Sequence, residues 1–114
     1  MSAAINLLHI LVIVPILFWI YSQRGKLPKN FCNIGLIVVA FGFGYHLWML
    51  KNLTDKTAWK SWIYALHILV VFPLIGWVLW QCNAGARKWH ELLLLLAFSA
   101  LGYHTYNLVK YWGQ

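Results

Sequence analysis

Four of the five histidines stand in two matching pairs along the chain. A shift of 58 residues, without a gap, superposes His9 on His67 and His46 on His104. Neutral imidazole ligates haem iron and transition-metal ions, and imidazole also takes up and releases protons near physiological pH. The repeated pattern therefore indicates cofactor binding, metal binding or proton movement as the chemistry to consider.

The match between the two halves of the chain extends beyond the histidines. Because 62% of the residues are hydrophobic, coinciding Leu, Ile and Val residues carry little weight, whereas rarer residues carry more. The informative matches are Pro15, Trp19, Gly44 and Tyr45, which recur as Pro73, Trp77, Gly102 and Tyr103. We interpret residues 1–56 and 59–114 as tandem copies of one unit.

The composition indicates a membrane protein. Only 10% of the residues are charged, and the mean hydropathy is +0.68. Four apolar stretches have roughly the 20 residues that a helix needs to cross a bilayer. We therefore expect an all-α membrane protein with one domain, residues 1–114, in which four transmembrane helices form two tandem hairpins. Each repeat holds two spans, so the pseudo-twofold axis should run along the membrane normal. The stretches lie near residues 5–23, 30–50, 62–81 and 90–112.

This arrangement places the four histidines in one layer, just inside the leaflet that faces the chain termini. A polar ring in lipid without a partner costs several kcal/mol, so the histidines should face the interior of the bundle. Gly42 lies one turn from His46, and Ala100 one turn from His104. Such small residues leave space for close helix packing or for a flat ligand.

Proline interrupts the first and third spans at equivalent positions. Pro15 and Pro73 each remove a backbone donor, so we expect kinks that free the carbonyl groups of Leu11 and Leu69.

Haem b is the first cofactor to consider, bound by two histidines for electron transfer in the membrane. Symmetry favours His46 with His104, or His9 with His67, as axial ligands. Tyr45 and Tyr103 are candidates to hydrogen-bond the propionates. The arrangement is similar to the histidine-bearing four-helix cores of membrane b-type cytochromes, a resemblance of architecture alone. Any enzymatic activity would at most be that of a membrane redox protein.

Three alternatives stay open. All four histidines could bind a transition-metal ion, although Asp55 is the only nearby carboxylate to orient them. The histidines could instead line a path for protons or metal ions, but the rest of each span is apolar. The chain could also be a structural tetraspan protein of an envelope or larger complex, its histidines bonded to one another and to Asn6 or Asn107. Expected partners are the bilayer, a redox partner or further copies of the chain.

Charge gives a weak prediction of topology. Five Lys and Arg residues lie in the first and third loops and four on the opposite side, which places both termini outside the cytoplasm. We expect the basic residues to bind lipid headgroups and not nucleic acid.

Cys32 and Cys82 lie near the loops assigned to the cytoplasm, where two free thiols are expected. The glycosylation sequon at Asn52 adjoins a span, and we interpret it as coincidental. His90, at the opposite surface from the layer, should have no part in the site.

Overall fold

The computed structural model of the chain describes residues 3–54 and 59–112. Four continuous runs of helix in these residues are long and apolar enough to cross a membrane, which confirms the expected all-helical fold with four candidate spans. The first run comprises α1 (Ala3–Leu8), the π-helical segment η1 (His9–Ile13) and α2 (Val14–Ser22). The second run is α3 (Lys29–Lys51). The third comprises α4 (Trp59–Leu66), the π-helical segment η2 (His67–Val71) and α5 (Phe72–Gln81). The fourth is α6 (Arg87–Tyr111).

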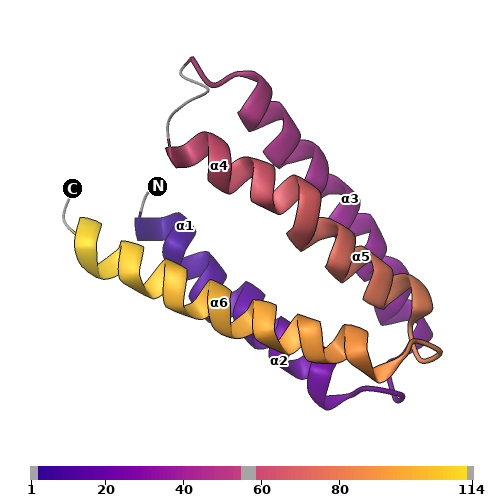
Figure 1. Cartoon of the computed structure of the whole chain (residues 1–114). Coiled ribbons are helices and arrows are strands. Elements are labelled where there is room, and N and C mark those ends of the chain that lie inside the picture. The colour runs from indigo at the N-terminus through magenta and orange to yellow at the C-terminus, as the bar shows by residue number, and fades with distance from the viewer. Residues whose placement is uncertain (1–2, 55–58, 113–114) are drawn as a thin grey trace. The chain divides into compact units, whose positions relative to one another are not determined.

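Contacts divide the chain into two compact units, which we describe separately. Unit 1 comprises residues 1–26 and 86–114, and in it α6 packs along α1, η1 and α2. Unit 2 comprises residues 27–85, and in it α3 packs along α4, η2 and α5 (Figure 1). Each unit thus takes one span from each copy of the repeat. The single domain and the tandem hairpins, in which each copy packs on itself, stay predictions.

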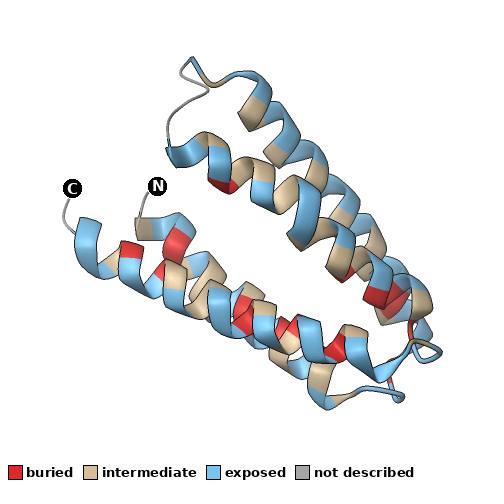
Figure 2. Cartoon of the chain, viewed as in Figure 1, coloured by how far each residue is buried: buried red, intermediate tan, exposed pale blue. Residues whose placement is uncertain are grey.

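Buried apolar side chains lie along the helices of unit 1, whereas in unit 2 all of them except Ile63 lie toward the end of α5 that adjoins Cys82 (Figure 2). In unit 1, Leu17 and Ile20 are three residues apart and so lie on the same face of α2. The repeat makes them equivalent to Ile75 and Val78, which are buried in unit 2. Other apolar side chains are exposed, such as Phe41 at 77%, as is suitable for helices surrounded by lipid.

Two π-helical turns begin at histidines. In η1 the Val14 N–H donates to the carbonyl of His9, five residues earlier, and in η2 the Phe72 N–H donates to the carbonyl of His67. The shift of 58 residues superposes these two turns. A π-turn widens the helix locally, and such turns are frequent at functional sites.

A proline follows each π-turn closely. Pro15 and Pro73 lie in the first turns of α2 and α5, directly after the π-turns and inside continuous runs of helix. The sequence predicted a proline kink here, and the structure has its irregularity one turn earlier, as a π-turn. The expected release of the Leu11 and Leu69 carbonyls stays a prediction.

Cys32 and Cys82 form a disulfide, so the expectation of two free thiols was wrong. That expectation rested on the assumed compartment and not on distance. Because unit 2 pairs α3 with α5, the first turn of α3 lies beside the end of α5, and the two Cα atoms are 5.8 Å apart, within the usual range for a disulfide. Asn83 supports the same contact. The Leu27 N–H donates to Asn83 Oδ1 at 2.7 Å, and Asn83 Nδ2 donates to the Leu27 carbonyl at 2.8 Å.

Candidate functional site

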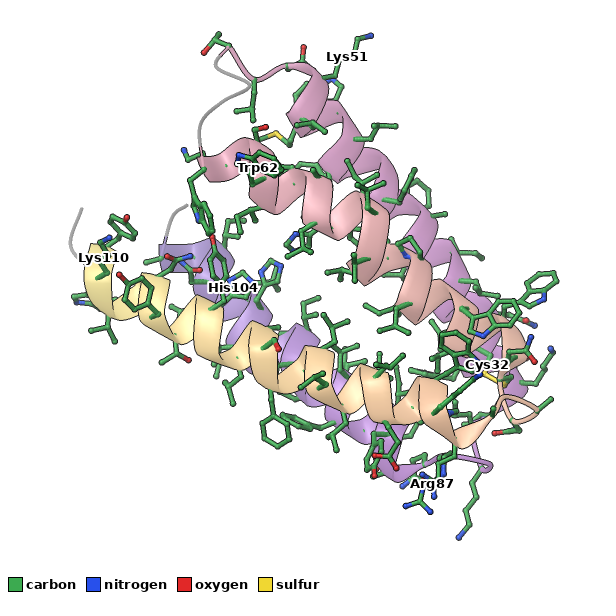
Figure 3. The ribbon with its side chains drawn as sticks, in the orientation of Figure 1. Cys32, Lys51, Trp62, Arg87, His104 and Lys110 are labelled. Atoms are coloured by element: carbon green, nitrogen blue, oxygen red, sulfur yellow. A yellow bond between two sulfur atoms is a disulfide. The ribbon has the colours of Figure 1, made fainter. Side chains whose placement is uncertain are left out.

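Unit 1 contains a stacked pair of histidines. The rings of His9 and His104 are nearly parallel, at 19°, with centroids 4.1 Å apart. His104 lies toward the Lys110 end of α6 (Figure 3) and is only 2% exposed. Its Nδ1 donates to Oδ1 of Asn6 at 2.9 Å. His9 is half-buried, and its Nδ1 donates to the carbonyl of Ile5 at 2.7 Å.

Unit 2 contains a second stacked pair. The rings of His46 and His67 meet at 13° with centroids 4.7 Å apart, and both side chains are half-buried. The Nδ1 of His46 donates to the Gly42 carbonyl at 2.8 Å, and the Nδ1 of His67 donates to the Ile63 carbonyl at 2.7 Å. Both histidines of this pair, like His9, therefore have Nδ1 hydrogen-bonded to a backbone oxygen one turn earlier in the same helix.

The two pairs correspond to each other under the 58-residue shift from which the sequence predicts a repeat. The shift of 58 residues carries His9 onto His67 and His104 onto His46, and so carries one stacked pair onto the other. The shift also carries Asn6 onto Tyr64, whose ring meets the edge of the His46 ring at 5.9 Å. Tyr64 has no amide oxygen, which explains why His46 bonds to its own helix while His104 bonds to Asn6.

These hydrogen bonds determine which ring nitrogen would be the ligand atom if the histidines bound a metal. A carbonyl oxygen only accepts, so the Nδ1 facing it must carry the proton, and in a neutral imidazole the lone pair is then on Nε2. Metal-ligating histidines are usually oriented in this way, by a second ring nitrogen that donates to a carbonyl or carboxylate oxygen. All four histidines thus have the tautomer that metal ligation through Nε2 would require.

The spacing within a pair is close to that of two ligands on one ion. A ring nitrogen of His9 and one of His104 lie within 4.8 Å of each other. Two nitrogens on one Zn²⁺ are at most about 4.2 Å apart, because each Zn–N bond is about 2.0–2.1 Å. The lone pair of a ring nitrogen lies in the plane of its ring, and the planes of His9 and His104 are nearly parallel, at 19°. One of the two rings would therefore have to turn out of the stack before both nitrogens pointed at one ion.

A haem does not fit between the rings of either stacked pair. Bis-histidine ligation sets the two Nε2 atoms on opposite faces of the macrocycle, with iron between them. Rings that lie face to face at 4.1 and 4.7 Å leave no layer for a macrocycle. The ligand pairs predicted from symmetry, His46 with His104 and His9 with His67, each combine residues of both units and stay predictions.

The small residues predicted beside the histidines have different surroundings. A Cβ atom added to Gly42 would lie 2.7 Å from Cε1 of Phe72, so close packing occupies the space that a flat ligand would need. Gly35 likewise packs on Leu79. Ala100 is half-buried. Of the two interpretations of these small residues, close helix packing is the one found at Gly42.

The two tyrosines adjoin their neighbouring histidines. The Tyr45 ring meets the His46 ring edge-on at 5.5 Å, and the Tyr103 ring meets the His104 ring at 5.1 Å. Tyr45 is 52% exposed. Their proposed role toward propionates stays a prediction. Asp55, the carboxylate considered for orienting the ligands, lies outside the described residues.

Sequence reasoning missed some residues around the histidines. Phe72 contacts His46, with ring centroids 4.9 Å apart, and its only signal in the sequence is its place beside Pro73. Tyr64 could have been found as the residue equivalent to Asn6, a polar residue in an otherwise apolar run. The π-turns had no signal except the repeated spacing of histidine and proline.

His90 lies at the opposite end of α6 from His104, three residues after Arg87, which Figure 3 labels at that end. The sequence predicts this position outside the histidine layer. His90 is 1% exposed, and neither of its ring nitrogens has a hydrogen-bond partner among the described residues. The buried residues between the two ends of unit 1 are apolar, including Leu17, Leu93 and Ala97.

Comparison with protein-family models, with curated proteins and with solved structures finds no match for the chain.

Proposed function

We propose that this protein binds a transition-metal centre in the membrane through the Nε2 atoms of His9, His46, His67 and His104, and that the centre carries electrons. The observation that carries this proposal is the hydrogen bond at every Nδ1, to Ile5, Gly42, Ile63 or Asn6. Four bonds of this kind put all four rings in the tautomer of a metal ligand. The proposal is also supported by the 58-residue shift, which carries the stacked pair of His9 and His104 onto the stacked pair of His67 and His46.

Two forms of the centre are to be distinguished. A metal ion such as Cu²⁺ or Zn²⁺ suits imidazole nitrogen, and the histidines of each pair would supply two such ligands once one ring turned out of the stack. Of these two ions only copper would carry electrons. Haem b is the second form, and it would take its axial ligands in the combinations predicted from symmetry. Haem would supply one-electron chemistry, while the chain would bind it and exclude water from it.

The test is the absorption spectrum of the full-length protein, purified in mild detergent after expression with added haem precursor, together with metal analysis of the same sample. A Soret band that sharpens on dithionite reduction, with separate α and β bands, identifies bis-histidine haem. A stoichiometric metal content without a Soret band identifies an ion. A colourless, metal-free protein that also takes up no added Cu²⁺, Zn²⁺ or haem would overturn the proposal.

A structural role is the second candidate, and a specific observation favours it. The buried pair of His104 and Asn6 resembles the polar contacts that hold transmembrane helices together. In that case the stacked pairs serve only to join α6 to η1 and α3 to η2. The same purified sample decides between the two candidates, because a structural protein keeps its fold with no metal bound and with none acquired on titration.

A further inference from the structure

The Cys32–Cys82 disulfide marks one end of unit 2. Cys32 lies in the first turn of α3, and Cys82 follows α5 directly. Figure 3 shows Cys32 and Lys51 at opposite ends of α3. Both half-cystines are buried, and the two hydrogen bonds between Leu27 and Asn83 close the same end. The disulfide therefore joins the second and third spans next to one membrane surface.

The chemistry of a disulfide relates this end to a compartment. Two thiols become one disulfide by losing two protons and two electrons, which a thiol–disulfide oxidoreductase of an oxidising compartment accepts. In the cytosol, glutathione and thioredoxin keep such thiols reduced. We propose that the end of the molecule with Cys32 and Cys82 faces the oxidising, non-cytosolic side of its membrane, and that both chain termini face the cytosol.

The charge distribution opposes this orientation only weakly. The loops at the disulfide end hold five Lys and Arg residues, and the opposite end holds four, one of which, Lys56, lies outside the described residues. A difference of one basic residue is a small bias under the positive-inside rule. Arg87, one of the five, forms an ion pair with Glu91 at 2.9 Å. The disulfide is the stronger indicator, because two buried half-cystines require an oxidant on their side of the membrane.

The sequon at Asn52 agrees with the proposed orientation. Its loop would face the cytosol, where the glycosylation machinery does not act. Asn52 also uses its side-chain amide to donate to the Trp48 carbonyl at 2.8 Å, at the end of α3. The histidines lie toward the same ends of their helices as the termini, so they would lie near the cytosolic leaflet. The orientation does not depend on whether these histidines bind a metal.

The first experiment measures orientation with two fusions at the C-terminus of the full chain in a bacterial host. Green fluorescent protein becomes fluorescent in the cytosol and not after export by the general secretion pathway, whereas alkaline phosphatase needs disulfides of its own and is active only outside. We expect a fluorescent fusion and an inactive phosphatase. An active phosphatase with a dark fluorescent-protein fusion would overturn the proposal.

The second experiment measures the disulfide by its gel shift with a polyethylene-glycol maleimide. Protein alkylated in unfolded form should take up no reagent before reduction and two molecules after it, since the chain has two cysteines. The control is C32S/C82S, which takes up none in either state. In a host that lacks the extracytoplasmic thiol oxidase, wild-type protein should take up two molecules without reduction. A disulfide that forms undiminished in that host, or free thiols in the normal host, contradicts the proposal.

Discussion

The Nδ1 atom of His104 lies 2.9 Å from Oδ1 of Asn6, and both side chains are at least 98% buried. The two residues come from opposite ends of the chain, so this contact joins α6 to α1 across unit 1. It also holds the His104 ring against His9, whose own Nδ1 is bonded to Ile5. Asn6 thus both stabilises the helix pair and orients a candidate ligand.

Asn6→Leu should destabilise the folded protein by about 1 kcal/mol, because it leaves the His104 Nδ1–H without its acceptor at a buried site. The measurement is the free energy of unfolding in mixed micelles, titrated with a denaturing detergent. Ser99→Ala is the matched control, since the exposed Ser99 hydroxyl donates only to the Leu95 carbonyl of its own helix, and its loss should change little. Equal stability of Asn6→Leu and wild type would mean that the contact does not hold α6 to α1.

His104→Ala and His46→Ala should each abolish the bound centre or weaken it at least ~10-fold, because each removes one Nε2 ligand. Metal content and the absorption spectrum are the measurements. Asn6→Leu should weaken the centre by roughly 10- to 100-fold through the orientation of His104 alone. Unchanged binding in all four single variants of His9, His46, His67 and His104 would show that the centre lies elsewhere.

The four candidate spans could be predicted from the sequence, because length and apolar composition are written in it directly. The partners of each span could not. The polar residues of the four spans are too few to form a continuous polar stripe, so the sequence does not identify the face that contacts a particular neighbour. The stacking of His9 on His104 follows from that pairing of helices.

Neither the disulfide nor the π-turns could be predicted from the sequence, and the reasons differ. Cys32 and Cys82 are equivalent to His90 and Arg24 in the other copy, so symmetry gave no indication that they pair. The π-turn before Pro15 is a matter of backbone hydrogen bonding, and sequence showed only that proline would disturb the helix.

His90→Leu should leave the centre unchanged and stabilise the protein by about 1 kcal/mol. Both ring nitrogens of His90 are buried without a hydrogen-bond partner among the described residues, so an apolar side chain of similar size removes a cost of burying polar atoms. Leu is preferable to Ala here, since truncation at a site that is 1% exposed would leave a cavity. The measurements are unfolding in mixed micelles and the spectrum. A loss of stability would reveal that His90 has a polar partner in the membrane.

Gly42→Ala should destabilise the protein by about 1–3 kcal/mol, because the new Cβ would meet the Phe72 ring. In the other copy of the repeat the equivalent residues are Ala100 and Val14, a larger residue opposite a smaller one. The double variant Gly42→Ala/Phe72→Val should therefore recover part of the loss.

Gly44→Ala is the matched control for this cycle. Nothing lies within 4 Å of a Cβ added to Gly44, so alanine there should be neutral or stabilising by up to ~1 kcal/mol through its higher helix propensity. The free energies of the four proteins in the cycle, measured in mixed micelles, give the coupling between residues 42 and 72. If Phe72→Val costs the same in the glycine and alanine backgrounds, the coupling is zero and the two residues do not pack as α3 and α5 place them.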